Sequence, residues 1–265
     1  MLTHGRDSLL KLAGKCVAVS LDPIMGWTCD SWLLDDDDVD IAVETYRELL
    51  SGGATDEVAE VLAQAGIDLE ALLQAQDEGN DRITRSDITE LIAAASVIGA
   101  DGWLADELHM PNVPKMARKK SDSGIDVLGV RLRHTPSDSL ASDEVLLIVS
   151  VKHSVDEKSA QGMRYKLVTS LSDDITPPYL AAQLRVLNGK LQEQGTAKEV
   201  AAKVYFFIRP TADPNKSLVG VGLVDPDLET SLSDQLQYLP DANGQKRHFR
   251  AVLVPGLRTL HERCP

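Results

Sequence analysis

The chain has 265 residues, a net charge of −14 and 43% apolar residues, which is the composition of an ordinary globular protein. No apolar run approaches the roughly 20 residues that a membrane-spanning helix requires. No basic stretch followed by an apolar core stands at the N-terminus, so a secretory signal is not expected. We therefore expect a cytoplasmic protein with no membrane association.

Acidic residues are concentrated in the N-terminal third. Residues 1–80 hold 17 acidic and 4 basic side chains, whereas residues 81–265 hold 24 acidic and 23 basic ones. Uniform acidity would disfavour nucleic-acid binding, but a balanced region with basic clusters can contact phosphates. Such clusters occur at Lys115, Arg118, Lys119 and Lys120, and again at Lys246, Arg247, His248 and Arg250.

Residues 1–80 are expected to form an acidic, mainly helical region. Apolar residues recur at helical spacing over 40–50 and again from residue 58, and each stretch is closed by glycine. A boundary near Glu78-Gly79-Asn80 would separate this region from a second domain over 81–265. That domain is expected to open with a helix from Ser86, whose apolar face has Glu90 on its shoulder.

Strand and helix patterns follow one another through residues 125–224. Strands are predicted over 125–132 and 145–151, the second apolar on both faces as in a covered central strand. Helices are predicted over 156–171 and 180–194, and two further strands over 204–208 and 217–224. This order predicts an α/β fold in which helices flank a central mixed sheet.

The first two predicted strands carry the candidate chemistry. Asp126 stands at the start of one strand and Lys152 near the end of the next, so adjacent strands would bring them to one edge of the sheet. A carboxylate that can hold a divalent cation, beside a lysine that can orient water, is the minimal equipment for metal-assisted phosphodiester hydrolysis.

The order of Glu90 on a helix, Asp126 on a strand and Lys152 on the next strand resembles the PD-(D/E)XK nuclease superfamily. Together with the flanking segments 87–90, 114–116, 124–126 and 204–208, it resembles the nuclease subunit of Hachiman-type anti-phage defence systems, over roughly residues 83–225. The resemblance implies a PD-(D/E)XK-like sheet, a nuclease that cleaves DNA with Mg²⁺ or Mn²⁺, and a helicase partner. It implies no small-molecule cofactor.

The resemblance also implies roles for individual residues. Asp126, Glu90 and the backbone carbonyl of Val151 would hold the metal, and Lys152 would orient the attacking water. Lys115, Arg118, Lys119 and Lys120 precede the site in a loop and are the best candidates for contacts to the DNA phosphates.

One residue departs from the family pattern. The family has Glu or Asp at position 150, where this chain has Ser150. A neutral hydroxyl is a much weaker ligand than a carboxylate for a hard dication. One explanation is that another acid compensates for the missing carboxylate. Glu157 on the following helix is a better candidate for this than Glu144, which lies ~20 Å away along the strand. The other explanation is that catalysis has been lost and the chain is an inactive adaptor of a defence complex. A third reading, independent of the resemblance, is a generic α/β interaction protein.

Overall fold

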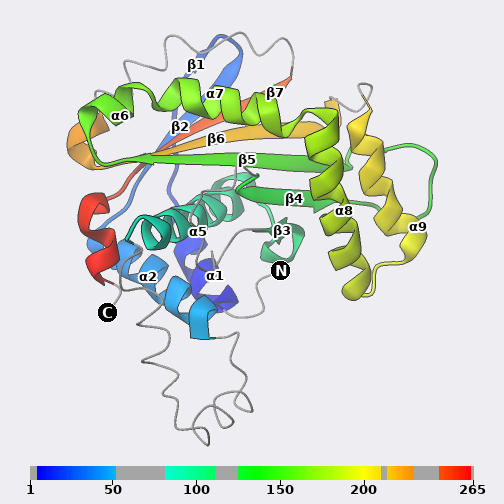
Figure 1. Ribbon diagram of the computed structural model, residues 1–265, viewed down its shortest axis with the longest axis horizontal. Coiled ribbons are helices and arrows are strands. Elements are labelled where there is room, and N and C mark those ends of the chain that lie inside the picture. The colour runs from blue at the N-terminus through cyan, green and yellow to red at the C-terminus, as the bar shows by residue number, and fades with distance from the viewer. Residues whose placement is uncertain (1–4, 52–80, 111–124, 210–213, 230–244, 264–265) are drawn as a thin grey trace, which may run out of the picture.

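The computed structural model describes residues 5–51, 81–110, 125–209, 214–229 and 245–263. Seven strands form one mixed sheet in the order β1-β2-β7-β6-β5-β4-β3 (Figure 1). These strands are β1 (Val19–Ile24), β2 (Trp27–Leu33), β3 (Leu108–His109), β4 (Val127–Arg131), β5 (Val145–Ser154), β6 (Lys216–Val224) and β7 (Lys246–Leu253). The prediction of an α/β fold with helices around a central mixed sheet is confirmed.

The centre of the sheet is parallel and its edges are antiparallel. Strands β2, β7, β6 and β5 run in the same direction. On one side β1 pairs antiparallel with β2, and on the other β4 and β3 add two antiparallel pairings beyond β5. The two central parallel strands β5 and β6 are buried on both faces along most of their length, which explains their continuous apolar runs.

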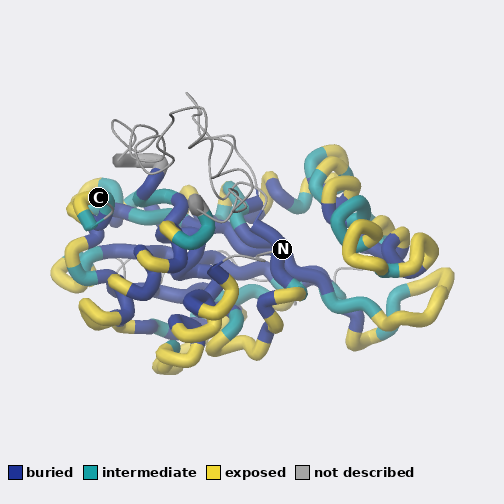
Figure 2. Tube along the Cα trace, turned by 90° about the horizontal axis from the view of Figure 1, so that it is seen from below, coloured by how far each residue is buried: buried dark blue, intermediate teal, exposed yellow. Residues whose placement is uncertain are grey.

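Helices cover both faces of the sheet (Figure 1). One face packs against α1 (Arg6–Gly14), α2 (Asp36–Ser51), α5 (Asp81–Asp101) and the 3₁₀ helix η5 (Leu257–Arg263). The other packs against α6 (Glu157–Gln161), α7 (Met163–Asp174), α8 (Pro177–Glu193) and the 3₁₀ helix η2 (Ala202–Ile208). The short helix α9 (Lys198–Ala201) packs against α8 and η2. Short 3₁₀ helices η1 (Ala105–Glu107) and η4 (Pro226–Leu228) complete the described elements. The sheet is the buried layer between the two groups of helices (Figure 2).

The predicted strand over residues 204–208 is wrong, because these residues form η2. Their β-branched and aromatic side chains favour a strand, yet burial follows a helical spacing. Val204 and Phe207 are buried three positions apart, whereas Tyr205 between them is exposed. Lys203 is also buried and forms an ion pair with the buried Glu144 ahead of β5. Tertiary packing and this ion pair outweigh the local preference for a strand.

The described part of residues 1–80 contains both helices and strands. Helices α1 and α2 agree with the predicted helical character, but β1 and β2 between them were not predicted. Strand β2 is hydrogen-bonded to β7, so this region supplies one edge of the same sheet. The proposed boundary near residue 80 lies outside the described residues.

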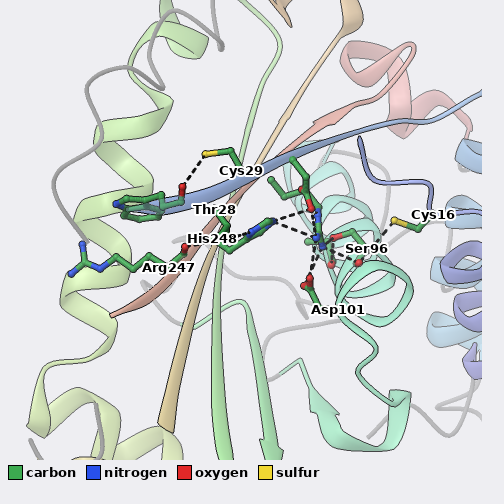
Figure 3. A network of polar contacts seen from close by, with 11 residues as sticks. Cys16, Thr28, Cys29, Ser96, Asp101, Arg247 and His248 are labelled. Atoms are coloured by element: carbon green, nitrogen blue, oxygen red, sulfur yellow. Dashed lines mark hydrogen bonds and ion pairs between the residues drawn. The ribbon is translucent and has the colours of Figure 1, made fainter. Parts of the chain in front are cut away.

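A buried guanidinium joins this edge of the sheet to α5. Arg250 on β7 is fully buried and donates from Nε to Asp30 Oδ1 at 2.8 Å and from Nη2 to Asp30 Oδ2 at 2.7 Å. It also contacts Asp101 at the end of α5 and donates to the carbonyl oxygen of Ser96 at 2.9 Å. Figure 3 shows Ser96, Asp101 and His248 converging on this centre. The cluster Lys246–Arg250, considered above as a phosphate contact, is therefore part of β7, with its last arginine inside the protein.

His248 extends the network toward the surface. Its Nε2 lies 3.1 Å from Asp30 Oδ2, and its Nδ1 lies 2.8 Å from the hydroxyl of Thr28. Burial alone would raise the pKa of Asp30, but hydrogen bonds from His248 and Arg250 outweigh burial and lower the pKa to about 2. The ionised carboxylate is therefore the form that the folded state stabilises.

We predict that Asp30→Asn lowers the free energy of unfolding by about 3 kcal/mol at pH 7, because it leaves a buried guanidinium with one carboxylate fewer. Since the pKa of Asp30 is lowered on folding, its contribution is present above the unfolded pKa of about 3.8 and is lost as the pH falls toward 2. Urea denaturation between pH 7 and pH 3 should show the gap between wild type and variant narrowing below pH 4.

The matched control is Asp106→Asn, which breaks the exposed Arg6–Asp106 ion pair. Such a pair contributes about 0–1 kcal/mol. Equal decreases in the free energy of unfolding of the two variants would show that the buried network contributes no more than an exposed ion pair.

Candidate active site

Asp126 lies where β4 begins beside β5. Val127 pairs with Val149, which sets Asp126 at the level of Ser150. The Asp126 Oδ2 accepts a hydrogen bond from the backbone N–H of Val151 at 2.6 Å. Strand β5 continues to Ser154 after its register with β4 has ended. The Asp126 carboxylate therefore lies beside the part of the β5 edge that no longer pairs with β4. The backbone carbonyl of Val151 lies on the same edge, because the N–H and C=O of one strand residue point to the same side.

Lys152 and Ser150 point to the α7 face of the sheet. Side chains alternate along β5: Val149 and Val151 belong to the core under α5, whereas Leu146 and Ile148 belong to the core under α7. Lys152 is half-buried, which leaves part of its side chain accessible. Asp126 lies level with Ser150, and Lys152 follows two positions further along the same face of β5.

A third charged residue, Asp174, was not predicted and belongs to the same group. It is the last residue of α7 and only 3% exposed. Within the described residues its Oδ2 has no hydrogen-bond partner. Burial and the nearby charge of Asp126 raise the pKa of the Asp174 carboxyl to about 7, although the charge of Lys152 opposes the shift. Asp126 and Lys152 are thus both close enough to Asp174 for their charges to act on its carboxyl group.

The packing of α7 on β6 explains how Asp174 reaches the site. Met163, Leu167 and Leu171 form the buried face of α7, and Asp174 follows three positions later on the same face. The helix lies close to the sheet because β6 has glycines beneath it: a Cβ at Gly222 would lie 2.8 Å from Met163 Sδ. An acid in the next position of an apolar helix face is the sequence signal that could have identified Asp174.

Such an acid is costly to the fold. A buried carboxylate near a like charge opposes its own ionisation, and a negative charge in the last turn of a helix also opposes the helix dipole. Ionisable groups kept in such surroundings are concentrated at functional sites. Asp174 is therefore the strongest single indication that this edge of the sheet has a chemical role.

Ser150 lies between Asp126 and Lys152 on the α7 face. It is fully buried, and its hydroxyl has no hydrogen-bond partner in the described part of the chain. Strand β5 has no carboxylate at position 150, where the resemblance implies one. The carboxylate of Asp174, on α7, lies on the same face of the sheet.

Glu90 approaches the sheet from the other side. It is a buried residue of α5, and α5 packs on the face that carries Val149 and Val151. Ser86 donates to Glu90 Oε1 at 3.4 Å. The structure thus places Glu90 on the face opposite Lys152, whereas Asp126, Lys152 and Asp174 are grouped.

The remaining candidates fall into three groups. Glu157 is exposed at the start of α6 and accepts a hydrogen bond from Gln161 at 3.3 Å. Glu144 is engaged in the buried ion pair with Lys203 and also accepts from the backbone N–H groups of Ala141 and Arg133. Glu144 is therefore a structural residue. The proposed DNA contacts Lys115, Arg118, Lys119 and Lys120 lie outside the described residues.

A divalent metal ion such as Mg²⁺ requires oxygen donors from the protein, completed by water. Among the described residues, no group of three or more His, Cys, Asp or Glu side chains could hold a metal ion. Mg²⁺, however, is commonly bound through one or two carboxylates and keeps several waters. Asp126, the carbonyl of Val151 and the buried Asp174 oxygen that lacks a partner fit this simpler arrangement.

Comparisons with known proteins add no assignment: no protein-family profile matches the chain, and the search of curated proteins gives no significant match. Within the described residues, no helix is both long enough and apolar enough to cross a membrane.

We predict that Asp174→Asn makes the metal-free protein more stable at neutral pH. Because the pKa of Asp174 is raised on folding, the folded state bears the cost of ionising it above pH 7 but not below the unfolded pKa of about 3.8. The variant should gain at most about 4 kcal/mol in unfolding free energy at pH 8, keep a smaller gain at pH 5 and lose the advantage near pH 4. Urea denaturation in EDTA-containing buffer measures both values.

Asp173→Asn is the matched control, since Asp173 is the exposed neighbour on the same helix end. It should change stability by less than about 0.5 kcal/mol. An Asp174→Asn variant that is less stable than wild type at pH 8 would show that Asp174 makes a structural contact.

Proposed function

We propose that this chain is a metal-dependent nuclease that cleaves DNA in anti-phage defence together with a helicase partner. The observation that carries the proposal is the grouping of Asp126, Lys152 and Asp174 at one edge of β5. Two carboxylates and a lysine supply the charges that metal-assisted hydrolysis of a phosphodiester requires. The resemblance to PD-(D/E)XK nucleases supports the same reaction, with Asp174 in the role of the acid missing from position 150.

Each residue has a distinct task in this proposal. Asp126, Asp174 and the carbonyl of Val151 hold Mg²⁺ or Mn²⁺, whose chemical contribution is to polarise the scissile phosphate. The hydrogen bond from the Val151 N–H fixes the orientation of the Asp126 carboxylate. Lys152 orients the attacking water and places a positive charge beside the oxygens on which negative charge develops. Glu90 has no direct task in this arrangement, because α5 holds it on the other face.

The charge of the chain favours delivery of the DNA by a partner. A net charge of −14 repels the phosphate backbone. Residues 81–265, with 24 acidic and 23 basic side chains, have no excess of positive charge to offset this repulsion. A helicase that holds and unwinds DNA would present the strand to the site. Tight binding of duplex DNA by the isolated chain at physiological salt would contradict this part of the proposal.

A second function, that of an inactive adaptor with the same fold, is favoured by Ser150. Its buried hydroxyl cannot replace a carboxylate as a ligand for a hard cation. If the chain is such an adaptor, we expect no metal-dependent cleavage and little effect of Asp126→Ala on defence.

Cleavage assays decide between these functions. We expect Mg²⁺- or Mn²⁺-dependent cleavage of plasmid or single-stranded DNA, tested with the chain alone and with a helicase encoded beside it. Asp126→Ala, Lys152→Ala and Asp174→Asn should each reduce the rate at least about 100-fold, because each removes a charge that acts on the transition state. Asp173→Asn should retain the wild-type rate. Absence of cleavage in every condition, with the helicase present, would favour the adaptor.

Metal binding can be measured without activity. Mn²⁺ at about 100 times its dissociation constant should stabilise the wild-type protein by about 2.7 kcal/mol, which raises the melting temperature by several degrees. Asp126→Ala and Asp174→Asn should lose this shift, and Asp173→Asn should keep it. An equal shift in all four proteins would place the bound Mn²⁺ elsewhere on this acidic chain.

A further inference from the structure

A large cavity lies between α8 and the edge strands β3 and β4. Its volume is about 1020 Å³, at the upper end of the range for small-molecule sites. Apolar side chains form much of its wall: Leu108, Val130 and Leu132 on the side of the sheet, and Leu187 and Leu191 on α8. None of Asp126, Lys152 and Asp174 lines it, so this cavity is distinct from the candidate active site.

Most of the charges around the cavity are neutralised by partners. Arg6 pairs with Asp106 at 2.8 Å, Arg131 with Glu107 at 2.9 Å, and Arg133 with Asp143 at 2.9 Å. Lys190 on α8 is the exception. The contact found for its Nζ is with His109 Nδ1 at 3.3 Å, and no acid within the described residues pairs with it.

His109 on β3 presents a second unmatched group. It is 5% exposed, and burial together with the charge of Lys190 lowers its pKa to about 3, so the imidazole is neutral. An ammonium group only donates, so Nδ1 accepts from Lys190 and the ring proton resides on Nε2. That buried Nε2–H has no acceptor among the described residues. Because this Nε2 has almost no exposed surface, Lys190 is the group that a ligand in the cavity can pair with.

From these features we propose that the cavity binds a small organic anion with an apolar body. The anionic group pairs with Lys190, and the apolar body packs against the leucines of α8 and the strands. A purely apolar ligand would leave the charge of Lys190 unmatched, and an inorganic anion would leave the apolar wall uncovered. Only a molecule with both features satisfies the whole lining.

Two fluorescent probes of nearly the same shape test the proposal. 1-Anilinonaphthalene-8-sulfonate carries an anionic group on an apolar body, and N-phenyl-1-naphthylamine is the same body without the sulfonate. We expect saturable binding of the sulfonate to the full chain, with an affinity about tenfold higher than that of the uncharged amine. Lys190→Met should remove this preference by weakening sulfonate binding about tenfold, which corresponds to one charge-assisted hydrogen bond, and should leave amine binding unchanged.

Lys198→Met is the matched control, because Lys198 is an exposed lysine of the neighbouring α9 that does not line the cavity. It should bind both probes as the wild type does. The proposal is overturned if neither probe binds saturably, if both bind equally to the wild type, or if the two lysine variants lose sulfonate binding to the same extent. Because neither lysine belongs to the candidate active site, the result is independent of nuclease activity.

Discussion

The buried guanidinium of Arg250 is the interaction on which the arrangement of the sheet edge depends. A fully buried positive charge is tolerated only where carboxylates and carbonyl oxygens surround it, and here they come from β2 and from the last part of α5. One side chain of β7 therefore fixes the strand beside it and the helix beneath it. Because α5 packs under β5 as well, the same contacts help to fix the layer on which the candidate active site is built.

The candidate site combines a rigid half with a costly half. The backbone N–H of Val151 in β5 fixes the orientation of Asp126. Asp174, in contrast, occupies a buried position of α7 at which an apolar residue would be more stable. The pKa of Asp174 is raised first by its burial and then by the negative charge of Asp126. A divalent cation would offset the charge of both acids, so this cost is consistent with the metal-ligand role proposed for them.

Parts of the fold with a strong local signal were predictable from the sequence. The apolar run of β5 and the helical spacing of α7 and α8 appear in the structure close to their predicted positions. Strand β1 was missed because it is exposed along almost its whole length and contains Pro23, and β7 was missed because its basic residues suggested a surface. Arg250 of β7 can be buried because it pairs with the carboxylate of Asp30, which is far away in the sequence.

The candidate site was predictable to the extent that its residues lie on neighbouring strands. Asp126 and Lys152 are separated by one hairpin connection, so strand pairing alone places them together. The position of Asp174 depends on how α7 folds back over β6, which no local pattern specifies. The side of the sheet on which Glu90 lies depends in the same way on the packing of α5, which no local pattern specifies.

The pairing of β2 with β7 has a consequence for synthesis on the ribosome. Asp30 and Arg250 are 220 residues apart, so the β1–β2 hairpin emerges long before the strand that it joins. A two-stranded hairpin is marginally stable by itself, and β2 then presents an open edge to any other nascent chain. The exposed β1, with its proline and aspartate, protects only the outer side of this hairpin. Completion of β7 thus closes the sheet, and chains stalled before it should be the form of this protein most prone to aggregate.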